Sequence, residues 1–311
     1  MGTVLPLLLG GLALFLYALT HLSEAMQGIF TERAKDTIAT YTRTIFHALF
    51  IGTFFTVLLG SSSAMIILVI IFINAEVLTF RQAIGLIMGA NIGTTFSSQI
   101  IALDITQYAA IPLLIGIGFE VISKTDKNKH IGKVLLYFGM LFFGLFVMEE
   151  SVAPLRDSST FLEWMKRLEN PVRGALVGGL TTLVIQSSSA TVGIAITLGK
   201  EGLITLGGGL AVMLGAEIGT CSDTLLATIR GKRAAIRAGV FHLVFNVLCV
   251  VIGLLLFQPL VTLVLKLSEE QSLNNQIANG HMLFNSLGVV LFLPFAGLME
   301  RLLNRWIPDV S

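Results

Sequence analysis

Two runs of three serines stand inside apolar sequence. Ser61–Ser63 precede "AMIILVI", and Ser187–Ser189, which follow Gln186, precede "ATVGIAI". A helix that starts at such a run has free backbone N–H groups and about half a positive charge at its first turn. Serine hydroxyls add hydrogen-bond donors that rotate to suit a ligand. Each run could therefore bind a tetrahedral oxyanion without a buried Lys or Arg.

A second polar island follows each serine run. "GANIGTT" lies downstream of the first run and "GAEIGTCSD" downstream of the second. The glycines could let a membrane helix unwind, and oxygen atoms there are of the kind that bind small hard cations. A cation that moves with a divalent anion would offset a cost of about 4.6 kcal/mol per 100 mV of opposing potential. The candidate sodium ligands are Asn91, Thr94, Thr95, Glu217, Thr220 and Asp223.

The two halves of the chain repeat each other. Ser187 follows Ser61 by 126 residues, and Gly215 follows Gly89 by the same interval. The segment 52–98 aligns with 178–224 without a gap, and the identities cluster on the two polar islands. Random matching of apolar residues would not place the identities there, so we infer an internal duplication.

The composition is that of a polytopic membrane protein. The 311 residues are 54% hydrophobic and 13% charged, with a mean hydropathy of +0.85, whereas soluble domains carry about 25% charged residues. The net charge of +1 gives no bias toward nucleic acid, and the two cysteines predict neither a disulfide framework nor a zinc site. Apolar segments near the ~20 residues needed to span a bilayer fall at roughly 4–22, 46–75, 83–103, 108–123, 133–150, 172–199, 205–228, 238–265 and 280–300.

The orientation of the two halves follows from counting crossings. If each serine run is the tip of a re-entrant hairpin, three crossings lie between the hairpins, and the hairpins enter from opposite faces. The bias of Lys and Arg then puts the first hairpin on the cytoplasmic side. If 46–75 instead spans the membrane fully, the number of crossings changes between odd and even, and this orientation no longer follows.

We predict an all-α membrane protein with one transmembrane domain over 1–311 and two inverted-topology repeats. Each repeat has a broken re-entrant hairpin and an unwound transmembrane helix. The repeats are expected at about 1–125 and 130–265, with a C-terminal helix at about 280–300.

Each polar feature also has a purely structural interpretation. Serine and threonine in membrane helices often bond the carbonyl four residues earlier, and glycines often permit close helix contact. The duplication favours function over both interpretations. His242 and Asn246 share a helix face, as do His281 and Asn285, because each pair is four residues apart. For these pairs we favour interhelical hydrogen bonds over substrate contact.

The doubled motifs resemble the type II sodium–phosphate cotransporter family, as a bacterial-type member. The resemblance rests on "QSSSA", "SSSA", "GANIGTT" and "GAEIGT", and it covers about 44–104 and 170–246. It implies alternating access and a sodium site that includes Asn91, Thr94 and Thr220. Two residues depart from the family pattern: Gly60 stands where the family has Gln, and Glu217 stands where Asn is common, which leaves sodium and proton coupling both open. The phosphate-binding residues implied are Ser61, Ser62, Ser63, Gln186, Ser187, Ser188 and Ser189.

We therefore expect a secondary active transporter that couples sodium to inorganic phosphate in the plasma (inner) membrane, and not an enzyme. It would need no cofactor beyond Na⁺ as the coupling ion, and its partners would be phosphate, sodium and the lipid bilayer, without nucleic acid. The alternatives are transport of another oxyanion, phosphate export, an intramembrane serine protease or a passive channel. Stoichiometry, direction and oligomeric state stay open, with a homodimer as one arrangement.

Overall fold

The chain is helical throughout the residues that the structure describes. The computed structural model describes residues 4–27, 38, 40–103 and 105–309. Within these ranges six helical stretches are long and apolar enough to cross a membrane, and shorter apolar helices lie between them. The predicted all-α membrane class is therefore confirmed. The six stretches are Val4–Ala25, Phe80–Ile101, Asp126–Asp157, Leu206–Ala227, Arg233–Leu255 and Leu273–Trp306.

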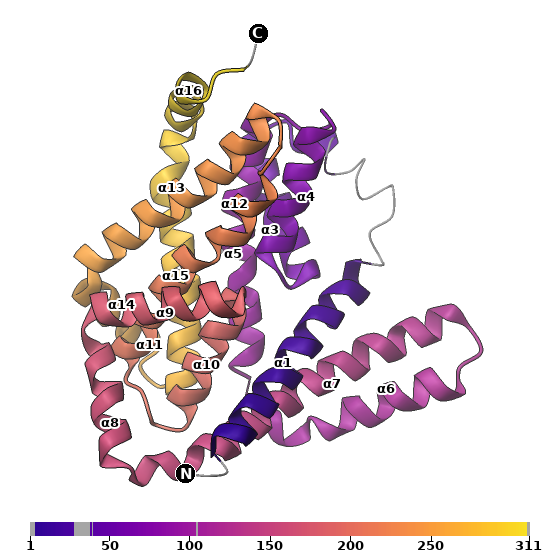
Figure 1. Cartoon of the computed structure of the whole chain (residues 1–311), viewed down its shortest axis with the longest axis vertical. Helices are drawn as coiled ribbons and strands as arrows, with labels where there is room; N and C mark the ends of the chain where they lie inside the picture. Colours follow the sequence, from indigo (N-terminus) through magenta and orange to yellow (C-terminus); the bar gives the residue numbers. More distant parts are fainter. Residues whose placement is uncertain (1–3, 28–37, 39, 104, 310–311) are drawn as a thin grey trace.

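Helices in the second half begin 126 residues after their counterparts in the first (Figure 1). The first half contains α1 (Val4–Gln27), α3 (Ile45–Leu59), α4 (Ser62–Asn74), α5 (Phe80–Ile101) and α6 (Ala110–Ile122). The second contains α7 (Asp126–Val152), α8 (Ser159–Lys166), α9 (Pro171–Ile185), α10 (Ser188–Lys200), α11 (Leu206–Gly219) and α12 (Cys221–Ala227). The chain ends with α13 (Arg233–Leu255), α14 (Phe257–Leu267), α15 (Leu273–Phe292) and α16 (Ala296–Trp306). The exact correspondence holds for α3 with α9, α4 with α10 and α5 with α11.

Local signals in the sequence set the ends of these helices. The side chain of Thr44 caps α3 and that of Asn170 caps α9, where Pro171 takes the first helical position. Thr79 and Gln82 form a reciprocal capping box at the start of α5. Thr205 caps α11 through the N–H of Gly208. Each cap satisfies a backbone donor that would otherwise be exposed inside or near the membrane.

The pair α3–α4 forms a hairpin that enters and leaves at one end of the molecule. Gly85, Gly89 and Gly93 of α5 lie in turn against the start, middle and last turns of α3, so α3 and α5 run in the same direction. Helix α4 then returns to the point where α5 begins, across the short turn 75–79. The tip of this hairpin, at Gly60, therefore lies beside the distal part of α5, where it shares a cavity wall with Phe96 and Ile100.

The pair α9–α10 has the same arrangement against α11. Gly174 of α9 lies against Ala211, and Thr182 lies against Gly219, so α9 and α11 also run in the same direction. Helix α10 returns to the start of α11 across 201–205. The tip of the second hairpin, at Gln186, thus lies beside the distal part of α11.

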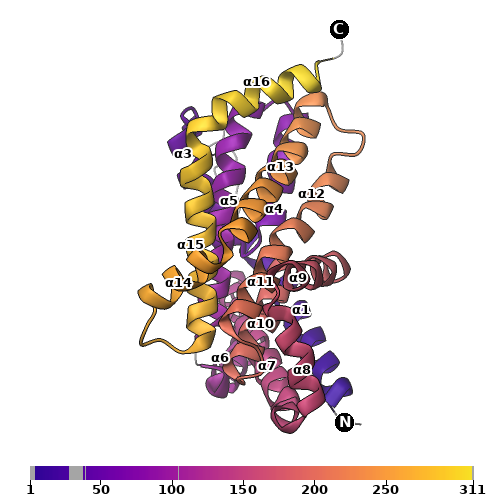
Figure 2. The same ribbon diagram turned by 90° about the vertical axis from the view of Figure 1, so that its left-hand side faces the viewer.

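Helix α15 shows that the two hairpins come from opposite ends. The Asn274 side chain at its start donates to the Ala102 carbonyl just after α5, so α5 and α15 are antiparallel. Helix α11 runs parallel to α15, because Gly209 lies against Ile277 and Glu217 contacts Asn285 further along. Helices α5 and α11 therefore run in opposite directions. Figure 2 shows α15 beside α5.

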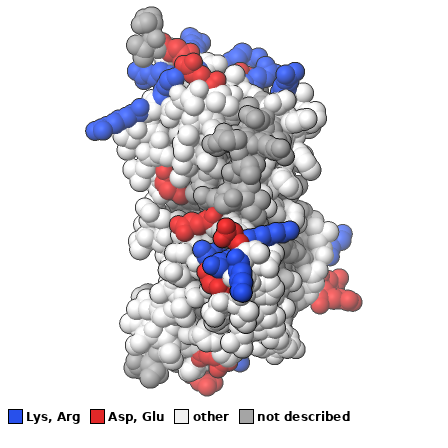
Figure 3. All heavy atoms as spheres, turned by 90° about the vertical axis from the view of Figure 1, so that its right-hand side faces the viewer, with Lys and Arg blue, Asp and Glu red and all other residues white. Residues whose placement is uncertain are grey.

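Charged contacts gather near the two ends of these helices. At one end Lys232 donates to Glu76 at 2.6 Å, and this hydrogen bond holds the pKa of that carboxyl below its ordinary value. At the other end Lys200 bonds Glu149 at 2.9 Å. Figure 3 shows Lys and Arg gathered at the end that carries the C-terminus and in a second group at mid-height, with broad uncharged areas elsewhere. Such areas suit contact with lipid.

The expected unwinding at the glycine motifs is wrong. Helix α5 continues unbroken through Asn91 and Thr95. In the second half the helix is interrupted only at Thr220, whose backbone is still helical. The glycines instead allow close packing. A Cβ on Gly89 would lie 2.1 Å from the Leu49 carbonyl oxygen, and one on Gly215 would lie 1.8 Å from that of Ala175. The interpretation set aside for the glycines, close helix contact, is thus the correct one.

Two predicted apolar segments also divide differently. The segment predicted at 238–265 is two helices, α13 and α14, which separate at Leu256. The C-terminal helix predicted at 280–300 is the second half of α15 followed by α16, with Pro294 in the 3₁₀ turn between them. Proline has no N–H to donate and clashes with the preceding turn, which explains the break.

Candidate functional site

The two serine turns have the same backbone conformation. Gly60 has φ 64° and ψ 12°, and its counterpart Gln186 has φ 57° and ψ 31°. Ser61 and Ser187 are then both extended, with φ of −152° and −149°. The left-handed conformation is free for glycine but costs other residues about 1–2 kcal/mol. The second turn therefore retains a glutamine despite this cost, which points to a use for its side chain.

The first serine of each run caps the helix that follows. The Ser61 hydroxyl accepts the N–H of Ala64 at 3.2 Å, and the Ser187 hydroxyl accepts the N–H of Ala190 at 3.2 Å. These two hydroxyls thus serve the helix ends. Ser63 contacts the hydroxyl of Thr220 at 3.3 Å. In the described part of the chain, the hydroxyls of Ser62, Ser188 and Ser189 have no side-chain or backbone partner and can turn toward a ligand.

Both turns line one cavity of about 330 Å³. Its walls include Gly60–Ala64 and Gln186–Ser189, so all seven residues predicted for phosphate lie around it. A face of α1 closes another side, with Leu19, Thr20, Ser23 and Glu24. The described residues that line the cavity include no Lys or Arg. The positive ends of α4 and α10 therefore supply the attraction for an anion.

Sequence reasoning missed the α1 wall. Thr20, Ser23 and Glu24 stand on one helix face at the end of an apolar segment, because their spacing follows the helical period. No duplicated motif marks them, and the only available signal was this polar face within a span.

The structure does not bring the six candidate sodium ligands into one shell. Asn91 donates to the Asn246 side chain, Thr95 bonds the Ile92 carbonyl of its own helix, and Glu217 contacts α15. Thr220 and Asp223 do meet, through Ser63, which lies within hydrogen-bonding reach of both. None of the six lines the cavity described above. Through Ser63, which lines the cavity, Thr220 and Asp223 are the two candidates linked to it.

Glu217 belongs instead to a buried network that joins three helices. His281 Nε2 lies 2.7 Å from Glu217 Oε1, and Asn285 donates to the same oxygen at 3.1 Å. The other ring nitrogen of His281 lies 2.7 Å from the Ser98 hydroxyl of α5. N–H donors that face a carboxylate occupy the place of a cation. Glu217 is therefore a poor sodium ligand in this arrangement.

The other histidine–asparagine pair braces the same region. His242 Nδ1 lies 2.8 Å from the Thr224 hydroxyl, and Asn246 donates to the Glu217 backbone carbonyl at 2.8 Å. Both pairs thus form interhelical hydrogen bonds, as predicted.

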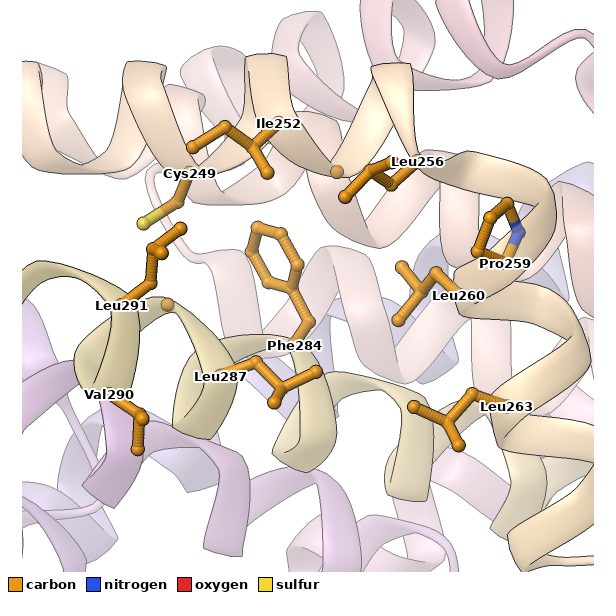
Figure 4. A pocket seen from close by; sticks show the side chains of 12 residues that line it. Cys249, Ile252, Leu256, Pro259, Leu260, Leu263, Phe284, Leu287, Val290 and Leu291 are labelled. Atoms are coloured by element: carbon orange, nitrogen blue, oxygen red, sulfur yellow. The ribbon is translucent and has the colours of Figure 1, made fainter.

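A second cavity does not suit an oxyanion. It has a volume of about 400 Å³ and lies between α13, α14 and α15 (Figure 4). Leucine side chains, Phe284 and the Cys249 thiol line it, and no hydroxyl, amide or charged side chain points into it. An anion would be desolvated there without compensation.

Comparison with known families decides the class of the chain. The family model described as Na⁺/Pi-cotransporter matches residues 14–150 and again residues 156–289. This chain belongs to the Na⁺/Pi-cotransporter family. The two matched stretches agree with the duplication found in the sequence. Membership also confirms the resemblance inferred from the serine motifs, and it makes the chain a multi-pass membrane transporter rather than an enzyme. The serine protease interpretation is thereby excluded.

Proteins with similar sequences come from bacteria and animals. The Bacillus subtilis protein YqeW is 31% identical over 302 residues, which cover 95% of this chain and 97% of YqeW. The Salmonella typhimurium protein named "Putative inorganic phosphate export protein YjbB" is 25% identical over 97% of this chain but only 55% of its own length. The human "Sodium-dependent phosphate transport protein 2B" is 39% identical over 159 residues, 46% of this chain and 23% of its own. No solved structure matches the chain.

Proposed function

We propose that this protein couples sodium to the transport of inorganic phosphate by alternating access. The observation that carries the proposal is the cavity shared by the two serine turns. Two helix N-termini and at least three hydroxyls without protein partners face one space. Phosphate would be held between Ser61–Ser63 and Gln186–Ser189.

The chemistry of the cavity suits a hydrated oxyanion that must bind and leave. Backbone N–H groups at the start of α4 and α10 donate to phosphate oxygens, and the helix ends contribute partial positive charge. Each charge-assisted bond is stronger than a neutral one. Because no Lys or Arg lines the described cavity wall, binding stays weak enough for release on the other side.

The arrangement of the hairpins supports alternating access. The hairpins α3–α4 and α9–α10 approach the centre from opposite ends, as expected for inverted repeats of a secondary transporter. We assign the repeats to about 1–125 and 130–265. A site held at the meeting point of two such repeats can open first to one side of the membrane and then to the other.

Sodium would bind next to the first hairpin tip. Ser63, Thr220 and Asp223 provide hydroxyl and carboxylate oxygens beside the anion cavity. By the repeat, Thr94 of α5 corresponds to Thr220, which makes Asn91, Thr94 and Thr95 candidates for a second cation once the hairpins move. Glu217 is left out because N–H donors already face it. Sodium dependence is also in the name of the human relative.

Phosphate export is the second candidate. A relative that matches 97% of this chain carries that function in its name. This chain corresponds to about half of that protein, so the shared part is the membrane portion described above. Export and uptake would use the same cavity and differ in the gradient that drives them.

Transport assays with purified protein distinguish these functions. In proteoliposomes we expect radiolabelled phosphate to accumulate when an inward sodium gradient is imposed, and radiolabelled sodium to enter with it. Replacement of sodium by choline should abolish accumulation. Equilibration of phosphate that never exceeds the external concentration, whatever the gradient, would contradict coupled transport and indicate a passive channel. Accumulation driven by a proton gradient alone would remove sodium from the proposal.

The serine assignment has its own test. Ser62→Ala and Ser188→Ala should each raise the apparent KM for phosphate about 3- to 10-fold, because one hydrogen bond to a charged ligand is lost. The exposed Ser159→Ala is the matched control and should leave the KM unchanged. Thermal unfolding should show that all three variants stay folded. Unchanged phosphate kinetics in both turn variants would remove the anion from the cavity.

A further inference from the structure

The anion cavity contains a charge of the wrong sign. Glu24 of α1 lines it together with the two serine turns, and it is the one ionisable residue among the described residues of its wall. A carboxylate repels a phosphate or sulfate ion at short range. A proposed anion site whose described wall holds an acid and no Lys or Arg needs an explanation.

The neighbours of Glu24 do not neutralise it. Among the described residues, the basic group that pairs with Glu24 is His21, whose Nε2 lies 4.0 Å from a Glu24 oxygen. The other ring nitrogen, Nδ1, lies 3.0 Å from the Tyr17 carbonyl, which can only accept, so Nδ1 carries the hydrogen. In neutral His21 the Nε2 atom then has a lone pair and cannot donate to Glu24. The Glu24 side chain is 62% exposed, so it is in contact with solvent.

The remaining groups in the cavity are mostly hydrogen-bond donors. Backbone N–H groups at two helix starts, the Gln186 amide and the serine hydroxyls suit the bare oxygens of an oxyanion. Hydrogenphosphate also carries one O–H group, which needs an acceptor. An ionised carboxylate accepts only, and Glu24 is the one carboxylate in the described wall.

We infer that Glu24 is a specificity-determining residue, which accepts a hydrogen bond from the P–O–H group of bound hydrogenphosphate and excludes anions that lack such a group. The inference rests on the proposed phosphate site. Sulfate has the same shape and charge as hydrogenphosphate but no O–H near neutral pH, so its oxygen would face the carboxylate with lone pair against lone pair. Sites built to bond a substrate hydroxyl can reject the analogue without it by about 10⁴-fold. The exposure of Glu24 weakens this effect, and we expect about 10- to 100-fold.

Competition with other oxyanions tests the inference. In proteoliposomes with wild-type protein, arsenate, which carries an O–H, should inhibit phosphate uptake, and sulfate should not. Glu24→Gln has the same size and no charge. We expect sulfate to become an inhibitor of this variant, with the ratio of sulfate to phosphate affinity raised about 10- to 100-fold and arsenate inhibition little changed. Glu24→Asp should keep the wild-type selectivity, and the exposed Glu270→Gln serves as the matched control.

The outcomes separate this inference from the proposed function. An unchanged sulfate to phosphate ratio in Glu24→Gln overturns the inference and leaves the phosphate site standing. A lower apparent sodium affinity with an unchanged ratio also overturns it, because Glu24 would then hold a cation. Absence of phosphate transport in the wild type defeats the proposed function itself.

If Glu24→Gln no longer transports, binding can be compared instead of transport. The thermal shift of the detergent-purified variant with sulfate and with phosphate then tests the ratio of sulfate to phosphate affinity. A sulfate shift in the variant alone supports the inference, and its absence opposes it.

Discussion

Gly215→Ala should loosen the contact between the second hairpin and α11 and lower the thermal stability of the folded protein. The new Cβ would lie 1.8 Å from the Ala175 carbonyl oxygen and 2.7 Å from the Gly179 nitrogen. Both are backbone atoms of α9, so no side chain can move aside. Overpacking of a tight core typically costs about 1–3 kcal/mol and here should reach or exceed the upper value. We expect the apparent Tm of the detergent-purified protein to fall by about 6–12 °C, measured by size-exclusion chromatography after heating.

Glycines elsewhere in the chain supply the control. A Cβ on Gly118 of α6 meets nothing within 4 Å, so Gly118→Ala should leave the Tm within about 2 °C of the wild type. The Tm of Gly89→Ala, the counterpart position in α5, should fall as far as that of Gly215→Ala, since the new Cβ would lie 2.1 Å from the Leu49 carbonyl oxygen. Normal yield and Tm for Gly215→Ala would show that α9 can move away from α11.

The glycine motifs show how far sequence reasoning reached in this fold. Duplication and apolar length predicted the hairpins and their tips at Gly60 and Gln186, and the structure has both. Whether the "GANIG" glycines unwind a helix or pack it depends on which backbone lies opposite. That partner, α3, is about 40 residues earlier in the chain, and no local pattern reports its distance. The packing answer therefore needed three-dimensional structure.

The candidate site, like the fold, is predictable from the sequence only in part. All seven predicted phosphate residues lie around one cavity because a serine run followed by an apolar helix encodes a cap and a helix start locally. Glu24 entered the site through the packing of α1 across both hairpins, which the motifs do not encode. The duplicated motif predicts Glu217 as a cation ligand. In the structure its carboxylate contacts His281 of α15, which lies outside the duplicated segments 52–98 and 178–224.

Gly60, which stands where the family has Gln, occupies a left-handed backbone position, and the motif alone does not show this. Both turns require a left-handed residue at this position, which glycine adopts without strain. The first turn thus has a glycine, which adopts this conformation without strain, and the second has Gln186, which does not. The two halves of the cavity differ in amide content, and Gln186 would make binding of the proposed phosphate asymmetric.

His281→Ala should be the most destabilising substitution of a polar residue in the core. Glu217 and His281 are 3% and 1% exposed, so the carboxylate has no access to water when its closest donor is removed. Leaving a buried polar group without its hydrogen-bond partner costs about 1–3 kcal/mol, and more when the group is charged. We expect the apparent Tm to drop by about 6–15 °C in the same heating assay.

The double variant Glu217→Gln/His281→Ala separates charge from packing. With no carboxylate left to bury, and with Asn285 still available to bond the amide oxygen, most of the lost Tm should return. His47→Ala is the control, because that ring is exposed at the start of α3 and should cost less than about 1 kcal/mol. A double variant no more stable than His281→Ala alone would mean that the space left by the ring, and not the unpaired carboxylate, sets the loss. Recovery in the double variant would identify the Glu217–His281 contact as the polar link that ties α11 to α15 within the membrane.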